Sequence, residues 1–548
     1  MILKKNSSKQ KLRGAYYTPL LLAEKIVDFF KGNRSLKNML EPSCGDGVFF
    51  DALINRKEIE KFDRLTGIEI EKKEVKKLSQ KFSSYKNLQI LRDDFFDFYK
   101  REQESSRYDL ILGNPPYIRY QYLTDEQRNE MAEILVSHKM KSNKLINTWV
   151  AFVVACVHML SDKGKIALVI PAEILQVAYA ADLRYYLSKN LANITIIAFK
   201  DLVFPNIEQE VVVFIGEKKS EKKGIRIIQF QNLEDLDAES VKKIEFQPLS
   251  STQEKWIRYF SSKEETDVLT KIKNDARFQK LSDCALINVG VTTGNNKYFS
   301  VDDDTAEKFD LKKIALPLIG RSSHANSVYF NRSDWEINVH GRKLAYLVNF
   351  PEKDYEKYSK KQKEYIQLGE IQGLNKGYKC SIREKWYRIP SIWIPDAFFL
   401  RRNNLYPKFV LNCCGAISTD TMHRMKFLEG VVPERVVLSY YNSISFAFAE
   451  LCGRSYGGGV LEILPGEVGN IYVPVLDSVP IKKIRQILKR VDEIIRNADN
   501  IELALDIVDE QILCDCLYVE KNVVAEARSI WHQMQTRRLA RSSRLQTE

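Results

Sequence analysis

The chain has 548 residues, of which 44% are hydrophobic and 28% are charged, and its formal net charge is +12. This length exceeds that of one ordinary domain, and the hydrophobic content is sufficient for two or three packed cores, which excludes a disordered chain. The positive balance favours a polyanionic partner, although ribosomal, membrane-surface and other basic proteins share it.

The sequence offers no sign of export. Its N-terminus lacks an apolar signal core, and no segment approaches about 18 uninterrupted apolar residues, so we expect neither secretion nor a membrane span. The nine cysteines show no paired C-x2-C spacing and no nearby histidines. We therefore expect free thiols, no metal site and a cytoplasmic location.

A helix and a glycine turn are predicted first. Apolar residues recur at helical spacing over residues 20–30, and Thr18-Pro19 before them is a typical helix start. A strand over residues 39–41 then enters the run Pro-Ser-Cys-Gly-Asp-Gly, followed by a helix over residues 48–54. Small residues let a ligand approach the backbone, and the helix start supplies amide donors. A lone Gly-x-Gly is weak evidence, but its place in an alternating strand and helix pattern strengthens it.

Two further strands are each followed by an acid. Residues 66–70 form the second predicted strand, whose end carries Glu69, and the third ends before Asp94 and Phe95. Carboxylates in these places can accept hydrogen bonds from the hydroxyl or amino groups of a ligand, and the phenyl ring can flank a planar group. An acid after a strand is common, so the weight of this evidence lies in the order of the elements.

The most informative stretch is residues 109–117. Its apolar run over residues 110–112 predicts a buried strand, and the Gly-Asn-Pro-Pro that follows cannot continue it because proline donates no ladder hydrogen bond. The carbonyls of Asn114 and Pro115 can point the same way, since proline and the residue before it are conformationally restricted. Two converging acceptors would bind an NH2 group, and Tyr117 offers a flat ring beside them.

The chain after this corner alternates again. Residues 119–142 are charged and longer than a simple connection, which favours a flap near a substrate, with a surface helix over residues 125–137 as the alternative or companion. The remaining predicted elements are a buried helix over residues 148–160 that contains Phe152, and strands over residues 165–171, 194–199 and 211–216, of which the last is antiparallel.

Asn-Pro-Pro-Tyr at a strand end is similar to the catalytic motif of amino-methyltransferases that use S-adenosylmethionine, above all the N6-adenine DNA methyltransferases. A Tyr-Thr-Pro element first, then the glycine turn, then the corner, with further sequence C-terminal, resembles the gamma class of that family in the style of type II restriction-modification enzymes. The resemblance is specific over about residues 14–216 and diffuse over about residues 255–475.

The resemblance implies roles for individual residues. Asn114 and Pro115 would bind the target amino group, and Tyr117 and Phe204 would hold a flipped-out adenine, although core packing also explains a single phenylalanine. The cofactor-binding residues that the resemblance implies are Tyr17, Thr18, Pro19, Glu41, Ser43, Gly45, Glu69, Ile70, Asp94, Phe95, Pro116 and Phe152. S-adenosylmethionine is the implied cofactor, and double-stranded DNA is the implied partner.

We therefore expect an α/β fold with three parts. A Rossmann-like, S-adenosylmethionine-dependent methyltransferase domain with a seven-stranded mixed sheet would occupy residues 1–245. A mixed α+β target-recognition domain would follow over residues 246–480, because loops such as residues 290–298 interleave aromatic with basic or small residues. A C-terminal helical segment over residues 481–548 would hold helices at residues 481–501 and 507–539.

Three alternatives stay open. The first is a protein methyltransferase that acts on glutamine, which uses the same motif. In those enzymes a small helical domain precedes the catalytic domain, whereas here the large extension follows it. An RNA amino-methyltransferase is the second. A non-catalytic DNA-binding module is the third, and intact Asn114, Tyr117, Glu69 and Asp94 argue against it. No nuclease motif is evident, so we expect a monomeric modification enzyme, either an orphan or paired with a separate cognate restriction endonuclease.

Overall fold

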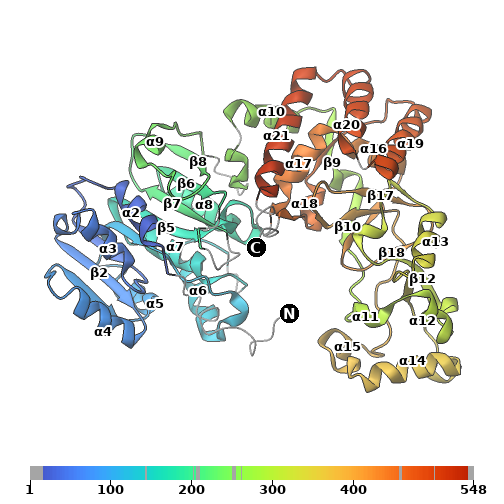
Figure 1. The fold of residues 1–548 in the computed structure, drawn as a ribbon, viewed down its shortest axis with the longest axis horizontal. Helices are drawn as coiled ribbons and strands as arrows, with labels where there is room; N and C mark the ends of the chain where they lie inside the picture. Colours follow the sequence, from blue (N-terminus) through green and yellow to red (C-terminus); the bar gives the residue numbers. More distant parts are fainter. Residues whose placement is uncertain are drawn as a thin grey trace. The chain divides into compact units, whose positions relative to one another are not determined.

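The computed structural model describes residues 17–141, 145–201, 203–204, 210–249, 255–260, 262–455, 459–498 and 500–540. The chain divides into two compact units, Met1–Lys263 and Glu264–Glu548 (Figure 1). Among the described residues, every helix is too short or too polar to cross a lipid bilayer.

The first unit contains one large sheet. Its strands are β1 (Asn38–Glu41), β2 (Arg64–Glu69), β3 (Leu88–Arg92), β4 (Tyr108–Gly113), β5 (Leu160–Pro171), β6 (Asn193–Phe199), β7 (Val211–Glu217) and β8 (Gly224–Phe230). They lie in the order β3-β2-β1-β4-β5-β7-β6-β8. β7 is antiparallel to β5 and β6, and every other neighbouring pair is parallel. The prediction of an α/β fold with a mixed sheet is confirmed.

The predicted number of strands is wrong, because the sheet has eight strands rather than seven. The additional strand is β8, which pairs in parallel with β6 from Asn193↔Gly224 to Phe199↔Phe230. The sequence suggested that this apolar segment leads out of the domain. It instead covers the free edge of β6, whose backbone N–H and C=O groups would otherwise lack partners.

Helices cover both faces of this sheet. The helices of the first unit are α2 (Leu20–Asp28), α3 (Val48–Asn55), α4 (Lys72–Lys81), α5 (Phe95–Glu102), α6 (Asp125–Ser137), α7 (Thr148–His158), α8 (Ala181–Asn190) and α9 (Ala238–Lys243). One core cluster joins α5, α6, α7 and α8 to the sheet, and a second joins α2, α3, α4 and α9. Successive residues of β4 alternate between the clusters, with Ile111 in the first and Leu110 and Leu112 in the second. This alternation explains the unbroken apolar run in the sequence.

The helix proposed over residues 125–137 is present as α6. The Thr124 hydroxyl accepts a hydrogen bond from the Gln127 amide at 3.2 Å, and the Gln127 side chain accepts one from the Thr124 amide at 3.1 Å. This reciprocal cap satisfies two amides that a helix start leaves without partners.

The second unit is built on smaller sheets. A five-stranded sheet has the order β10-β19-β15-β17-β13 and a four-stranded sheet the order β11-β14-β12-β18. The strands of the unit are β9 (Phe278–Lys280), β10 (Ala285–Val289), β11 (Ser300–Val301), β12 (Ala315–Ile319), β13 (Tyr329–Phe330), β14 (Tyr346–Val348), β15 (Ala397–Leu400), β16 (Arg402–Asn403), β17 (Phe409–Asn412), β18 (Ile417–Ser418), β19 (Met422–Phe427), β20 (Arg454–Ser455), β21 (Leu461–Glu462) and β22 (Tyr472–Pro474).

Helices surround these sheets and form the end of the chain. They are α10 (Lys263–Lys273), α11 (Asn296–Phe299), α12 (Asp303–Lys308), α13 (Arg332–His340), α14 (Lys360–Ile371), α15 (Tyr378–Ser381), α16 (Pro433–Tyr440), α17 (Ser443–Cys452), α18 (Pro465–Gly469), α19 (Ile481–Ala498), α20 (Ile501–Val508) and α21 (Lys521–Leu539). The division between the units at Lys263 falls later than the boundary expected at residue 245. Trp256 and Tyr259 explain the difference, because both are buried in a core cluster of the first unit.

The predicted helix over residues 507–539 is interrupted in the structure. A π-helix at Asp509–Cys514 follows α20, and Tyr518 has a positive φ of 53° before α21 begins. The buried Asp509 side chain accepts hydrogen bonds from the Ser443 amide at 3.0 Å and the Ser443 hydroxyl at 2.5 Å. This anchor to α17 is a tertiary contact that helical periodicity cannot reveal.

A buried ion pair fixes α21 to α17. Arg538 is 2% exposed and Glu450 is 4% exposed. Arg538 donates from Nη2 to Glu450 Oε1 at 2.6 Å and from Nε to Oε2 at 3.1 Å. Its Nη1 also donates to the carbonyls of Asn404 and Gly459. The last helix is therefore an integral part of the second unit.

We predict that Arg538→Met lowers the free energy of unfolding by about 3–5 kcal/mol, because Glu450 would remain buried without its partner. Urea denaturation of the full-length protein measures this loss. Arg485→Met in α19, whose exposed side chain pairs with Glu434 at 3.0 Å, is the control and should cost less than about 1 kcal/mol. Equal losses in the two variants would contradict the prediction.

Candidate functional site

The predicted site residues meet at one edge of the large sheet. β1, β2, β3 and β4 run parallel, so their carboxyl ends lie at the same edge. Glu41 and Glu69 end β1 and β2, Asp94 follows β3, and Asn114 follows β4. Residues that are far apart in the sequence are thereby brought together where open α/β sheets bind their ligands.

Asn114 is held from several sides. Its side-chain Nδ2 donates to the Thr18 hydroxyl at 3.1 Å, and its Oδ1 accepts from the Tyr117 hydroxyl at 2.6 Å. The Ser43 hydroxyl donates to the Asn114 carbonyl at 3.2 Å. The corner after β4 is therefore tied to both the start of α2 and the turn after β1, and the Thr18 contact orients Oδ1 as the acceptor.

The Tyr117 hydroxyl has two acceptors within reach. Besides Asn114 Oδ1, the carbonyl of Val169 in β5 lies 2.9 Å from it. A phenol carries one hydrogen, so the hydroxyl can turn to Val169 and leave Oδ1 to another donor. Pro115 is buried, and its carbonyl accepts no hydrogen bond from the described residues.

The glycine turn after β1 is built around Glu69. Gly45 and Gly47 have positive φ values of 52° and 79°. The Gly45 amide donates to Glu69 Oε2 at 2.9 Å, and the Glu71 amide donates to Oε1 at 2.8 Å. A Cβ at Gly47 would lie 2.7 Å from the Leu78 side chain, so only glycine fits there. Burial raises the pKa of Glu69.

Glu41 lies with its carboxyl group at the same edge of the sheet, at the end of β1. It is 1% exposed, and its Oε2 has no hydrogen-bond partner among the described residues. Burial, together with the negative charges of Asp46, Asp51 and Glu69, raises its pKa well above the usual range. A buried carboxylate oxygen of this kind fits a positively charged donor supplied by a ligand.

Asp94 and Phe95 lie just after β3. Asp94 Oδ1 accepts a hydrogen bond from the Phe96 amide at 2.8 Å and thereby caps α5, while Oδ2 accepts none from the described residues. Phe95 and Phe152 are buried and stack with ring centroids 4.6 Å apart. No planar group fits between rings at that separation, so a ligand ring would lie beside this pair.

The other predicted site residues differ in exposure. Tyr17 is 51% exposed and Ile70 is 58% exposed, so both can border an open site, and Pro19 directly precedes α2. Pro116 is half-buried. Phe204 is 5% exposed and belongs to the same core cluster as Phe199 and Val211. The structure thus brings most of the predicted residues to one edge and buries Phe204 in a core.

Sequence reasoning missed a polar network after β5. Asn147 Nδ2 donates to the Tyr179 hydroxyl at 3.0 Å and to Glu173 Oε2 at 3.4 Å, and its Oδ1 accepts from the Tyr120 amide at 3.3 Å. Tyr179 also donates to Glu173 Oε2. The network holds the segment after Tyr117 against the strand next to β4. The signal available in the sequence was Glu173, an acid two residues beyond an apolar strand.

The strand order with its antiparallel β7, the glycine turn after β1 and the Asn-Pro-Pro-Tyr corner after β4 define a Rossmann-like methyltransferase. The family model described as "Eco57I restriction-modification methylase" matches residues 22–204, and "Type II methyltransferase M.Eco57I, C-terminal domain" matches residues 253–513. The chain is a methyltransferase of the type II restriction-modification style, which confirms the family that its motifs predicted.

Individual relatives support this family. The type II methyltransferase M.AccI of Acinetobacter calcoaceticus is 26% identical over 541 residues, which cover 92% of this chain and 94% of that protein. M.HindII of Haemophilus influenzae is 25% identical over 343 residues, which cover 60% of this chain and 62% of that protein. The solved structure of the type IIL restriction-modification enzyme MmeI in complex with DNA matches with a TM-score of 0.58 and 15% identity. It covers 96% of this chain and 80% of that one, and at this identity the likeness concerns the fold alone.

Proposed function

We propose that this chain transfers a methyl group from S-adenosylmethionine to the N6 amino group of adenine at a specific site in duplex DNA, with the target base flipped out. The observation that carries the proposal is the oriented Asn114 at the end of β4, beside the turn after β1. The names of the type II methyltransferase relatives, and a related fold solved in complex with DNA, support DNA as the substrate.

The residues at the sheet edge fit the proposed cofactor. The ammonium group at its methionine end would give Glu41 Oε2 a positively charged donor, which this buried oxygen does not have among the described residues. Glu69 can accept from ribose hydroxyls, since two backbone amides already fix its orientation. Asp94 Oδ2 can accept from the amino group of the cofactor's adenine. When bound, the cofactor supplies a methyl group already activated by a sulfonium.

The protein's task is then to orient the nucleophile. The lone pair of an exocyclic adenine nitrogen is delocalised into the ring, so hydrogen bonds that favour a pyramidal nitrogen make it available for in-line attack. Asn114 Oδ1 and the Pro115 carbonyl are the proposed acceptors, and they also stabilise the positive charge that develops on nitrogen. The Tyr117 hydroxyl can leave Oδ1 by turning to Val169. The Asn147 network supports this corner by holding the Tyr120 amide.

Tritium transfer from labelled S-adenosylmethionine distinguishes this function from its rivals. Plasmid DNA, total RNA and cell extract are offered as separate acceptors to the full-length protein. Label in DNA, recovered as N6-methyladenine after digestion, is the expected result. Label in RNA or on protein glutamine would replace the proposal with one of those activities, and no transfer to any acceptor would favour a binding module.

Two carboxylates test the cofactor site. Glu69→Ala and Asp94→Ala should each weaken S-adenosylmethionine binding by about 1–3 kcal/mol, because buried donors of the cofactor lose charged acceptors. Isothermal titration calorimetry measures the affinity. Asp97→Ala is the matched control, because it removes an exposed acid from α5, the helix that Asp94 caps. Unchanged affinity in both site variants would mean that the cofactor binds elsewhere.

Asn114→Ala tests the catalytic corner. We expect methyl transfer to fall by about 10²-fold or more, as when a preorganised hydrogen-bonding group is removed, while cofactor affinity stays within a few-fold of wild type. Single-turnover kinetics with labelled cofactor give the rate. Asn190→Ala, at the end of α8, is the control outside the site. A wild-type rate in the Asn114 variant would refute the central claim.

Base flipping is tested once the methylated position has been mapped. A 2-aminopurine placed there should gain fluorescence when wild-type protein binds, because the base leaves the stack. Tyr117→Ala should weaken retention of the flipped base by about 1–3 kcal/mol, the scale of base–aromatic stacking. Tyr117→Phe keeps the ring and should retain most of the signal. Productive binding without any rise in fluorescence would exclude flipping.

A further inference from the structure

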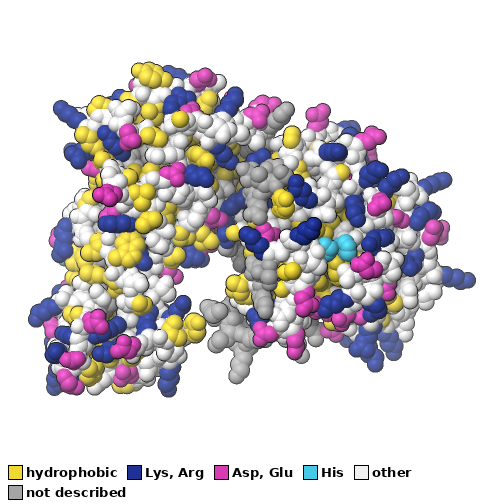
Figure 2. All heavy atoms as spheres, turned by 180° about the vertical axis from the view of Figure 1, so that it is seen from behind, with side chains coloured by type: hydrophobic (Ala, Val, Ile, Leu, Met, Phe, Trp, Pro, Cys, Tyr) yellow, Lys and Arg dark blue, Asp and Glu magenta, His cyan; other side chains and the backbone are white. Residues whose placement is uncertain are grey.

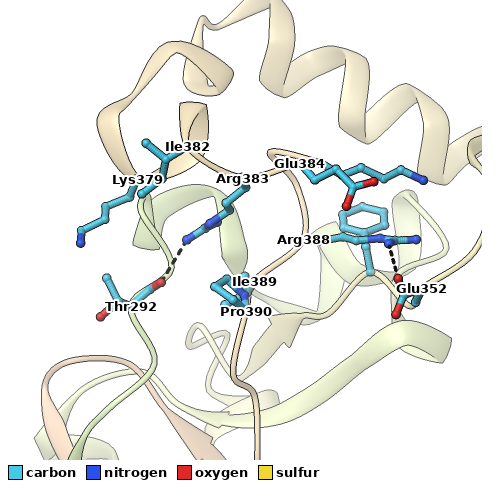
Figure 3. A pocket seen from close by; sticks show the side chains of 11 residues that line it. Thr292, Glu352, Lys379, Ile382, Arg383, Glu384, Arg388, Ile389 and Pro390 are labelled. Atoms are coloured by element: carbon cyan, nitrogen blue, oxygen red, sulfur yellow. Dashed lines mark hydrogen bonds and ion pairs between the residues drawn. The ribbon is translucent and has the colours of Figure 1, made fainter.

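The second unit contains a cavity of about 600 Å³ that is separate from the sheet edge in the first unit. It is lined by the loop after β10 at Thr292, by Phe350, by Lys379 of α15, and by Arg383, Lys385 and Arg388 in the segment that follows α15 (Figure 3). Thr292 and Lys379 are exposed, so the cavity is open to solvent.

The cavity is positively charged. Its lining includes four cationic side chains and two acids, Glu352 and Glu384. Lysines and arginines are spread over the face of the molecule that Figure 2 shows, so positive charge alone does not single out one patch there.

The lysines of the cavity differ in their pairing from several lysines elsewhere in the same unit. Lys312, Lys363 and Lys426 pair with acids at 2.9, 2.5 and 2.8 Å, respectively. Lys379 and Lys385 make no ion pair with any part of the chain that the structure describes. Their charges are therefore available to an external anion.

Backbone carbonyls hold both arginines in place, and Arg388 also pairs with the Glu352 carboxylate. Arg383 donates from Nη2 to the Thr292 carbonyl at 3.1 Å and from Nη1 to the Trp386 carbonyl at 3.4 Å. Arg388 donates from Nη2 to the Lys353 carbonyl at 2.9 Å and from Nη1 to Glu352 Oε1 at 3.4 Å. Figure 3 shows Arg383 pointing to Thr292 and Arg388 to Glu352. These contacts fix positive charge before binding, which reduces the entropy that binding would cost.

The loop after β10 is packed directly against α15. Gly294 has a positive φ of 87°, and a Cβ added there would lie 3.0 Å from Cys380 Sγ and 3.1 Å from Lys379 Cβ. Glycine is therefore required for this close approach. The Thr292 hydroxyl and the Lys379 ammonium are kept on the same side of the cavity as Arg383 (Figure 3).

We propose that this cavity receives a backbone phosphate of duplex DNA outside the target base pair, with Lys379 and Lys385 as the contacting charges and Arg383 as the group that positions the loop. The inference rests on the proposed function. A phosphate is favoured over a base edge because flexible ammonium groups act as point charges, whereas base edges are read by rigid bidentate donors and acceptors. The open, solvent-exposed form of the cavity suits a segment of a long polyanion.

Salt dependence of DNA binding tests this assignment with the full-length protein. The affinity for a short mixed-sequence duplex is measured by fluorescence anisotropy over a range of potassium chloride concentrations. Lys379→Ala and Lys385→Ala should each reduce the slope of log K against log[salt] by about 0.9, and the double variant by about twice that, because each phosphate contact releases counterions. Lys379→Arg and Lys385→Arg should keep the slope of wild type.

Lys489→Ala is the matched control, since this α19 side chain is 78% exposed and lies 3.9 Å from Glu493. It removes the same charge and should leave the slope unchanged. Circular dichroism and S-adenosylmethionine affinity check that the variants are folded. An unchanged slope in the double variant, while wild-type protein binds and methylates DNA, would overturn the phosphate assignment and leave the proposed function standing. Failure of the wild-type protein to methylate any DNA would overturn both.

Discussion

The parallel pairing of β1 with β4 is the constraint on which the site depends. Met39 lies opposite Leu110 and Leu40 opposite Ile111, so the turn after β1 and the corner after β4 leave the sheet side by side. The Ser43 hydroxyl then reaches the Asn114 carbonyl at 3.2 Å. Because side chains alternate along a strand, a shift of one residue would exchange the two faces of β4 between separate cores, and the apolar packing therefore fixes the register of the polar corner.

Electrostatics at this edge are unbalanced without a ligand. Glu41 is buried, and one of its oxygens has no hydrogen-bond partner among the residues that the structure describes, whereas two backbone amides hold Glu69. Burial raises the pKa of both carboxyl groups. The packed sheet around the two carboxyl groups offsets the free-energy cost of burying them. The proposed cationic cofactor would lower that cost. In the second unit, by contrast, the buried Glu450 is neutralised by Arg538.

How far the sequence predicted the molecule can be judged from particular elements. Apolar strands, proline positions and the capping pattern at Thr124 depend on local chemistry, and the elements predicted for the first unit lie close to their observed positions. The helices α4, α5, α8 and α9 were not predicted from the sequence. The partner of β8 could not be predicted, because an edge strand pairs with whichever edge is free. The break before α21 depends on Asp509 contacting Ser443, a residue distant in sequence.

The sequence by itself determined that β4 ends in a rigid polar corner, since proline geometry restricts the backbone around Asn114. It also determined the family, because the motifs stand in one order along the chain. Only the tertiary structure decided that the Tyr117 hydroxyl reaches the Val169 carbonyl, that Phe95 stacks on Phe152, and that Arg383 closes one side of a basic cavity. The physical reason is that these contacts join residues from different elements, and their distances depend on how whole layers pack rather than on local conformational preference.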